Sequence, residues 1–418
     1  MFATVRQIFN SKNRDIQKKI LFTFAALFIF KLGTTITVPG INLDTTSLGF
    51  LEIVNAMSGG AFEKASIFAL GVMPYISASI IIQLLSMDIV PYLADLSKQG
   101  GTGRTKLNQI TRVVGIILAF VQGYMYSFSY IKNGSAMDYM LYSLVLTAGT
   151  ALVLWIGDQI TQKGIGNGTS MIIMAGIITT LPGMFSGMWT ELITGGKGFI
   201  GILTFILFLI VFLSIIVGVI FEENAERRIP IQYANKSTST LGKQNYIPFK
   251  LNSAGVMPVI FASAVFTIPQ IIASFVKNAD LSLFITKYVS YTTLTGFIAY
   301  VLLIIGFAYL YTFMQLKPKE LAENLNKNGG YIPGVRPGNE TEDYVKKILK
   351  RITIVGACFL ALLASLPILF SEFSTLQTSI TISGTGLLIV VGVALETYKQ
   401  LESQLVSRTY TKGRKGRR

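Results

Sequence analysis

The sequence predicts an all-α polytopic membrane protein with ten transmembrane helices in two inverted five-helix halves and a re-entrant half-helix. Of its 418 residues, 51% are hydrophobic and only 14% are charged, whereas soluble chains carry about 25% charged residues. Apolar runs long enough to cross a bilayer, which takes about 20 residues, recur along the whole chain. Basic residues are concentrated in alternate connections between these runs, as is typical of cytoplasmic loops.

The composition also excludes several kinds of site. The chain has no His and a single Cys, Cys358. Zinc centres built from His and Cys, His-based acid–base catalysis, Cys–His nucleophiles and an intrachain disulfide are therefore not expected. We predict neither a metal, a cofactor nor an enzymatic activity. The formal charge of +15 would by itself suit nucleic acid or an anionic membrane surface.

Ten membrane spans are predicted in order along the chain. The first follows a basic segment, and no small-residue cleavage site comes after it, so we expect a retained span rather than a signal peptide. The fourth and the tenth are short. The spans are 20–38, 66–87, 113–131, 140–157, 170–190, 199–221, 255–276, 291–316, 352–371 and 381–397.

The basic residues orient the spans. Of the 36 Lys and Arg residues, 30 lie on one side, 5 lie in the opposite loops, and Lys31 lies within the first span. The richer side is the cytoplasmic one, so both termini are predicted to be cytoplasmic. An odd number of spans in each half gives the halves opposite orientations. We expect an N-terminal half at 1–190, a C-terminal half at 191–398 and a basic tail at 399–418.

The segment 57–70 does not suit a lipid-facing helix or a solvated loop. Gly59 and Gly60 are followed by Glu63 and Lys64, and a charge at the bilayer centre costs about 2.5–3.5 kcal/mol. The neighbouring residues are too apolar for a loop in water. A re-entrant half-helix packed inside protein satisfies both constraints, and an amphipathic external connector is the alternative.

Aliphatic residues form a stripe on the second span. Val72, Ile76 and Ile80 are spaced four residues apart and therefore share one helix face. Ile173 and Ile177 repeat the spacing on the fifth span. Periodicity alone does not distinguish a hydrophobic constriction from ordinary packing.

Two predicted cytoplasmic loops are longer than a connection requires. Loop 222–250 alternates Ile and Tyr residues on either side of a polar turn at 235–240, which predicts a β-hairpin. Loop 317–351 contains a run rich in Gly and Pro at 328–338, which predicts a compact turn holding Arg336. Such basic loops serve either as topology signals or as docking surfaces.

Several stretches resemble the SecY family of protein-translocation channels. They include Glu226-Arg-Arg-Ile-Pro-Ile-Gln-Tyr-Ala234 and Gly329-Gly-Tyr-Ile-Pro-Gly-Val-Arg-Pro-Gly338. They occur in the family's order and extend over nearly the whole chain. The matching ranges are 65–84, 103–112, 164–170, 226–234, 252–263, 321–325, 329–338, 384–391 and 400–404.

The resemblance implies an hourglass channel between the two halves, in the bacterial plasma membrane. A lateral gate is implied between spans 2–3 and 7–8. Gly386 stands where the family often has Ser, which predicts looser packing there. The implied pore ring consists of Val72, Ile76, Ile173, Ile177, Ile260 and Ile389, and the implied plug includes Met57, Ser58, Gly59, Gly60, Ala61, Phe62 and Lys64.

The resemblance also implies partners. Arg336 matches the family's arginine in the loop where the SecA ATPase and the ribosome dock, with a possible contact to ribosomal RNA. Arg227, Arg228, Lys236 and Lys243 lie on the other projecting loop. SecE and SecG small membrane subunits, polypeptides with signal sequences and the lipid bilayer complete the implied set.

Three alternative functions stay open. They are an accessory SecY paralogue for specialised export, a secondary transporter and a purely structural membrane assembly factor. A coupled transporter normally buries carboxylates at mid-membrane, and the predicted spans offer no good pair.

Overall fold

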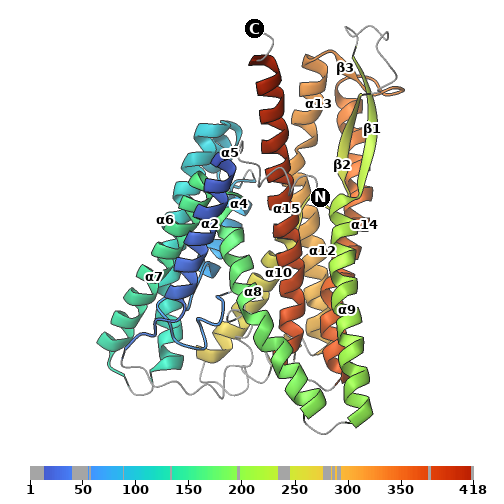
Figure 1. Cartoon of the computed structure of the whole chain (residues 1–418). Coiled ribbons are helices and arrows are strands. Elements are labelled where there is room, and N and C mark those ends of the chain that lie inside the picture. Colours follow the sequence, from blue (N-terminus) through green and yellow to red (C-terminus); the bar gives the residue numbers. More distant parts are fainter. Residues whose placement is uncertain are drawn as a thin grey trace.

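A computed structural model shows a predominantly helical chain (Figure 1). In Figure 1, α2, α4, α5, α6 and α7 lie on the left, α9 and α12–α15 lie on the right with the strands at their upper end, and α8 and α10 lie between them. The described residues are 14–39, 55, 58–87, 89–131, 134–194, 198–233, 245–275, 284, 288–289, 293–374 and 378–415.

The first group of helices begins with local signals that the sequence carries. Ser135 and Asp138 form a reciprocal capping box at the start of α7, and the Asn167 side chain accepts from the Thr169 N–H at the start of α8. The group comprises α2 (Arg14–Gly33), α4 (Met73–Leu85), α5 (Pro91–Lys98), α6 (Gly101–Tyr130), α7 (Ala136–Lys163) and α8 (Gly168–Trp189), which continues into the π-helical turn η4 (Thr190–Thr194).

The second group contains the longest helices. Lys317, in the left-handed conformation at φ 32°, ends α12 and starts α13 at a sharp bend. The elements are α9 (Gly198–Asn224), β1 (Glu226–Tyr233), β2 (Asn245–Lys250), α10 (Met257–Phe275), α12 (Leu294–Leu316), α13 (Pro318–Lys327), β3 (Gly330–Tyr331), α14 (Asn339–Ser374) and α15 (Thr378–Lys415).

Each predicted span coincides with a helix for most of its length, and the chain is a multi-pass membrane protein. Within the described residues, α6, α7, α8, α9, α12 and α14 are long and apolar enough to cross a membrane, while α4 and part of α10 are shorter apolar helices. The second span is helical only from Met73 onward, because Gly71 has a φ of +53°. Residues 66–72 therefore belong to the turn that precedes it.

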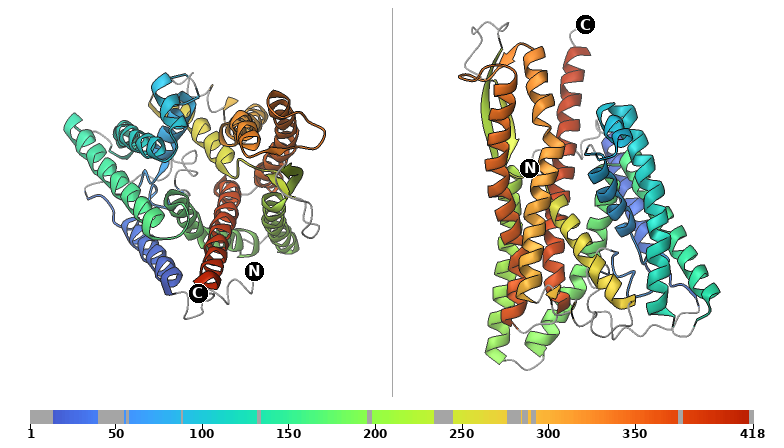
Figure 2. Two further views of the ribbon diagram at one scale, coloured as in Figure 1. Left: turned by 90° about the horizontal axis from the view of Figure 1, so that it is seen from above. Right: turned by 180° about the vertical axis from the view of Figure 1, so that it is seen from behind.

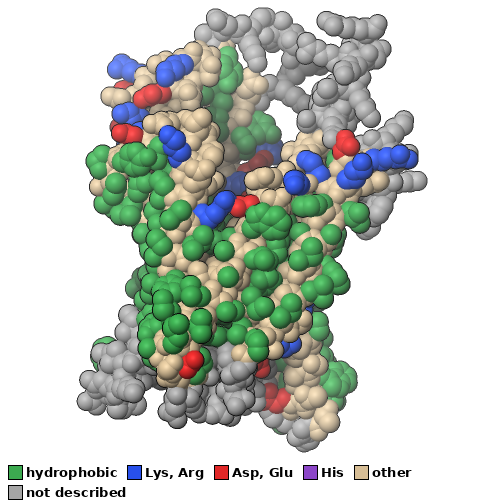
Figure 3. Space-filling model, turned by 90° about the vertical axis from the view of Figure 1, so that its left-hand side faces the viewer, with side chains coloured by type: hydrophobic (Ala, Val, Ile, Leu, Met, Phe, Trp, Pro, Cys, Tyr) green, Lys and Arg blue, Asp and Glu red, His purple; other side chains and the backbone are tan. Residues whose placement is uncertain are grey.

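The outer surface fits a bilayer. Hydrophobic side chains cover the middle of one face, and Lys and Arg gather towards its upper end (Figure 3). On α9, Phe199, Leu213 and Val217 are each more than half exposed. Apolar side chains exposed along a long helix are expected to face lipid.

The projecting sheet has the order β2-β1-β3 and is antiparallel throughout. Its hairpin strands confirm the hairpin predicted in loop 222–250, whose turn at 235–240 lies outside the described residues. Ile229 and Ile231 of β1 are buried and alternate with exposed residues. Ile229 and Phe249 pack against Val345 of α14 and its neighbours, so the sheet rests on that helix.

One buried hydrophobic cluster joins the two groups of helices. It takes side chains from α2, α4, α6, α7 and α8 and also from α10 and α15. In the view from above, α8, α10 and α15 lie between the outer helices of the two groups (Figure 2). The interface between the groups is therefore part of the core.

Candidate functional site

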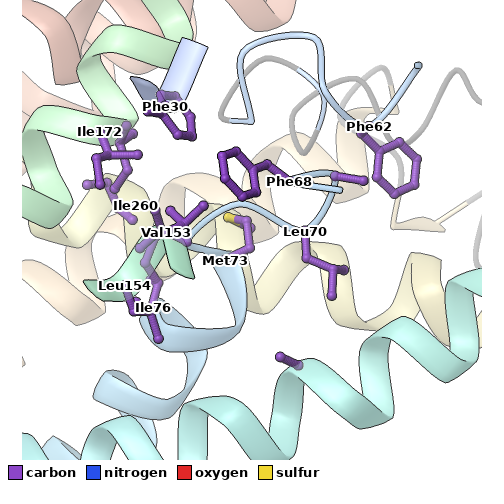
Figure 4. Close-up of a cluster of buried hydrophobic side chains, with 14 of the residues drawn as sticks. Phe30, Phe62, Phe68, Leu70, Met73, Ile76, Val153, Leu154, Ile172 and Ile260 are labelled. Atoms are coloured by element: carbon purple, nitrogen blue, oxygen red, sulfur yellow. The ribbon is translucent and has the colours of Figure 1, made fainter. Parts of the chain in front are cut away.

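The six aliphatic positions singled out from the sequence are brought together. All are buried, with 1–7% of each residue exposed, and all belong to the cluster that joins the two groups. Figure 4 shows Ile76 and Ile260 in this cluster, together with Phe68 and Met73. Val72 directly precedes α4 and Ile76 lies in its first turns. The other four are Ile173 and Ile177 on α8, Ile260 on α10, and Ile389 on α15.

This arrangement has a simple chemistry. The six side chains are branched and carry no hydrogen-bonding group, so the space between them has no polar partner for water or an ion. A constriction of this kind excludes ions by dewetting. Such side chains also make no sequence-specific hydrogen bond.

Gly386 does not loosen the packing beside these residues, contrary to the expectation from the sequence. A Cβ atom at this position would lie 2.8 Å from Cγ2 of Ile177, which is closer than real side chains approach. The Ile177 side chain already occupies the space that a larger residue would take. The glycine therefore permits a close contact between α15 and α8.

Most of the segment 58–70 is buried, as predicted, but it is a series of turns rather than a half-helix. Gly59, Gly60 and Ala65 within it, and Gly71 directly after it, have positive φ angles between 43° and 80°, and a right-handed helix does not accommodate such residues. We call residues 58–70 the plug segment. Met57, which was assigned to the plug, lies outside the described residues.

Backbone pairing with the chain that follows α2 replaces helical hydrogen bonds in the plug segment. The Val38 N–H donates to the Ala65 carbonyl at 3.0 Å, and the Ile67 N–H donates to the Ile36 carbonyl at 3.0 Å. The backbone groups are thus satisfied by a neighbouring strand-like stretch, as burial requires.

Aromatic rings pack the plug segment against the helices around it. Phe68 stacks on Phe30 of α2 with ring centroids 6.0 Å apart, and Phe62 meets Tyr126 of α6 edge-on at 5.0 Å. A Cβ atom at Gly33 would overlap the Phe68 ring. The position of the plug segment therefore depends on having glycine, with no side chain, at position 33.

Polar contacts hold the start of the plug segment. The Ser58 hydroxyl accepts from the Phe62 N–H at 3.2 Å and donates to the Asn55 carbonyl at 3.0 Å. The Lys31 ammonium on α2 donates to the Gly59 carbonyl at 3.2 Å. Lys64 is exposed.

A seam between helices runs beside the aliphatic residues. Helix α10 packs against α4 and α6 of the first group, and against α12 of its own group. These are the helices of the second, third, seventh and eighth predicted spans. The two groups meet again where α15 packs against α8.

The basic residues of the hairpin differ in their contacts. Arg228 is held locally: it forms an ion pair with Glu226 at 2.7 Å, and its guanidinium lies 4.8 Å from the centre of the Tyr246 ring. The hydrogen bond to Glu226 raises the pKa of Arg228. Arg227 is exposed, whereas Lys236 and Lys243 lie outside the described residues.

Arg336 lies in the neighbouring loop and reaches into solvent. Its side chain is 87% exposed, with Glu340 at 4.0 Å, and its carbonyl accepts from the Thr341 hydroxyl at 2.8 Å. Gly334 and Gly338 flank it with positive φ angles of 83° and 103°. This confirms the compact turn predicted from the Gly and Pro residues.

The sheet joins the two loops, which the sequence did not indicate. Gln232 and Tyr233 of β1 pair with Tyr331 and Gly330 of β3, and the Tyr331 hydroxyl donates to the Gln232 side chain at 2.9 Å. A two-residue strand leaves no recognisable pattern, and its partner lies about a hundred residues away in the chain. Arg227 and Arg336 consequently belong to one connected projection.

Nor did the sequence indicate a charged cluster where α9, β2 and α15 meet, next to the projecting sheet. The Lys399 ammonium of α15 donates to the Glu223 carbonyl at 2.7 Å, and Lys250 and Lys399 each lie 4.0 Å from the Glu223 carboxylate. The carboxylate of Glu222 is buried and has no hydrogen-bond partner among the described residues.

Two further features bear on ligands and partners. Within the described residues, no group of three or more acidic, His or Cys side chains is placed to hold a metal ion. An apolar cavity of about 770 Å³ lies between α2, α8 and α15, and its lining includes Phe24, Phe28, Met174, Lys31 and Thr179.

Comparisons of sequence add relatives that extend over the whole chain. The sequence model of the SecY family matches residues 66–398. A protein translocase subunit SecY from Staphylococcus epidermidis is 47% identical over 433 residues and covers 100% of both chains. The Bacillus subtilis protein of the same name is 46% identical over 427 residues, covering 98% of this chain and 99% of its own.

Comparisons of structure find the same architecture at low sequence identity. A solved protein-conducting channel matches with a TM-score of 0.70 at 19% identity, over 94% of this chain and 93% of its own. The Sec61 channel of a canine ribosome–channel complex matches with a TM-score of 0.66 at 18% identity, again over 94% and 93%. At these identities, the matches show a shared fold.

Proposed function

Because the chain belongs to the SecY family, we propose that it is the central protein-conducting channel of a Sec translocon, through which unfolded secretory polypeptides cross the membrane. The observation that carries this function is the convergence of six aliphatic residues at the interface between the two groups of helices. A passage at the interface between two groups of helices can widen when the groups move apart.

The aliphatic residues form the pore ring in this proposal. Four elements supply them, two from each group of helices, so a relative movement of the groups widens the ring. In the closed channel the ring is dry and blocks ions. Around a moving polypeptide the flexible aliphatic side chains pack against whatever side chain passes.

The plug segment closes the external side of the ring. The evidence for this role is that Phe62, Phe68 and Leu70 of the plug segment are buried in the same hydrophobic cluster as the ring residues. A series of turns detaches more readily than a helix packed along its length, which suits a part that must leave the passage.

The lateral gate is the seam between α4 and α6 on one side and α10 and α12 on the other. A segment of about 20 apolar residues is more stable in lipid than in an aqueous passage. Opening this seam would release such a segment sideways into the bilayer. Polar segments would continue through the ring.

The projecting sheet and the turn at Arg336 receive the partner that supplies energy, either the SecA ATPase or the ribosome. Arg336 and Arg227 are exposed on one projection, and an arginine offers several donors to an acidic or phosphate group. The channel itself is not an enzyme in this proposal, and both of its termini are cytoplasmic in the bacterial plasma membrane.

Small membrane subunits of the SecE and SecG kind complete the assembly. The cavity between α2, α8 and α15 is lined mainly by apolar side chains and has the character of a surface for a transmembrane helix of a partner. The exposed apolar face of α9 is available to lipid or to the same partner.

Site-specific crosslinking tests the route. A photoreactive amino acid at Ile76 or Ile260 should crosslink a secretory polypeptide that is stalled during translocation, whereas the same group at Leu213, which is 59% exposed on α9, should crosslink lipid. A stalled chain that reaches Leu213 and neither ring position would refute the proposed route.

Charge reversal tests the docking surface. Arg336→Glu should abolish SecA-driven export into vesicles while the protein still folds, because it places a negative charge where an acidic partner docks. Lys327→Glu is the matched control, since Lys327 is also well exposed, at 75%, on the adjacent helix α13. Undiminished export by Arg336→Glu would refute a docking role for this arginine.

A further inference from the structure

We infer that Lys31 is the positioning residue that holds the plug segment in its closed place, through the hydrogen bond from its ammonium group to the Gly59 carbonyl. This inference rests on the proposed function, because it assigns the residue that keeps the proposed seal shut. Neither the ring nor the plug assignment requires such a residue.

The geometry joins two separate elements. Lys31 lies in the last turn of α2, while Gly59 lies 28 residues further along, at the start of the plug segment. Their contact of 3.2 Å is a direct hydrogen bond between a charged donor and a backbone acceptor. Breaking this bond costs more than breaking one between neutral groups.

Gly59 is a suitable point of attachment because its neighbours confine it. It has a φ of +74°, and a Cβ atom there would lie 3.1 Å from Cα of Gly176 and 3.2 Å from the Thr179 hydroxyl on α8. The turn therefore fits closely against α8 on one side and is held by α2 on the other. Pulling Gly59 away breaks both contacts together.

The surroundings of Lys31 favour the bound position. Lys31 lines the cavity between α2, α8 and α15, where most lining side chains are apolar. An ammonium group facing such a surface without an acceptor is costly. When the plug segment leaves, Lys31 loses its acceptor, so the ammonium group favours the return of the segment.

The simpler explanation is that Lys31 only extends to the membrane surface, as lysines near the ends of membrane helices commonly do. A cation in the last turn also interacts favourably with the helix dipole. Neither effect requires Gly59. The two explanations therefore differ in what happens when the ammonium group is replaced.

The test is ion conductance of the resting channel in planar bilayers. Lys31→Met keeps the length of the side chain and removes the donor, and we expect the resting leak to rise by at least about tenfold. Lys31→Arg keeps a charged donor and should restore the seal. Lys18→Met, which removes an exposed lysine from the same helix α2 outside the plug segment and the ring, is the control and should leave the leak unchanged.

A second readout follows the plug segment itself. In a Cys358→Ser background, the buried Ser66→Cys thiol should react faster with an impermeant maleimide when Lys31→Met is present and return to its slow rate with Lys31→Arg. Equal rates in all three channels would overturn the inference. So would a fast rate with Lys31→Arg, because a conservative donor would then fail to hold the segment.

Deletion of residues 58–70, which keeps the ring residue Val72, separates this inference from the proposed function. If the deletion raises the leak and Lys31→Met adds nothing further, Lys31 acts through the plug segment. If Lys31→Met raises the leak of the deleted channel as well, the inference is wrong. If the deletion itself has no effect on leak, the plug assignment fails, and the inference fails with it.

Discussion

Substitution of Gly33 by Ala should displace the plug segment. Gly33 is the last residue of α2, and a Cβ atom there would overlap the ring of Phe68, which is itself stacked on Phe30. The ring is buried and held on its other face, so it has little room to move aside. The closed state must shift to accept the methyl group, whereas a displaced plug segment avoids the clash.

The size of the effect follows from the cost of overpacking. An extra methyl group in a well-packed core costs about 1–3 kcal/mol. If this cost falls only on the closed state, the population of channels with a displaced plug segment rises by about 5- to 150-fold. The change is large enough to measure even if part of the clash is relieved by rotation of Phe68.

Thiol accessibility measures this population directly. In a Cys358→Ser background carrying Ser66→Cys, the rate of reaction with an impermeant maleimide reports how often the buried position 66 opens. Gly187→Ala on α8 is the matched control, because no described atom lies within 4 Å of its Cβ position. We expect the control to react at the original rate.

Two outcomes would refute this reasoning. One is a reaction rate with Gly33→Ala that equals the rate of the control. The other is a rise that persists unchanged when Phe68→Leu is added, because a smaller side chain removes the ring that causes the clash. Coupling between the two substitutions is expected for residues in direct contact.

Three further predictions concern single contacts. Gly386→Ala places a methyl group against Ile177 and should lower the free energy of unfolding by about 1–3 kcal/mol, measured by thermal unfolding in detergent; an unchanged midpoint would contradict the close packing. Tyr331→Phe removes the hydrogen bond to Gln232 and should cost about 0.5–1.5 kcal/mol, seen as faster amide exchange in β3; equal exchange would contradict it. Glu222→Met replaces a buried carboxylate that has no partner among the described residues and should stabilise the protein by about 1–3 kcal/mol; a lower midpoint would contradict the view that it is unpaired.

The helices and the hairpin were predictable from local patterns. The run of apolar residues over 199–221 defines α9 almost to its ends, because burial in lipid depends on length and apolarity within one segment. The alternation of Ile and Tyr residues after Glu226 likewise defines β1. Both patterns are contained within a single short segment of the sequence.

The form of the plug segment was not predictable in the same way. The sequence indicated a buried segment that is neither lipid-facing nor solvated, and the structure agrees. The predicted half-helix was wrong, because backbone pairing of Ala65 and Ile67 with residues 36–38 competes with helical hydrogen bonds. That pairing depends on where α2 ends, which the composition of the segment does not reveal.

The sequence by itself determined that this chain crosses a membrane repeatedly and which family it resembles, and it predicts a cytoplasmic side for the basic loops. Only the tertiary structure decided that Ile177 fills the space beside Gly386, that β3 joins two loops into one projection, and that Lys31 reaches Gly59. The physical reason is the range of the interactions. Hydrophobic length and alternation act along the chain, whereas these contacts exist only after distant helices have packed.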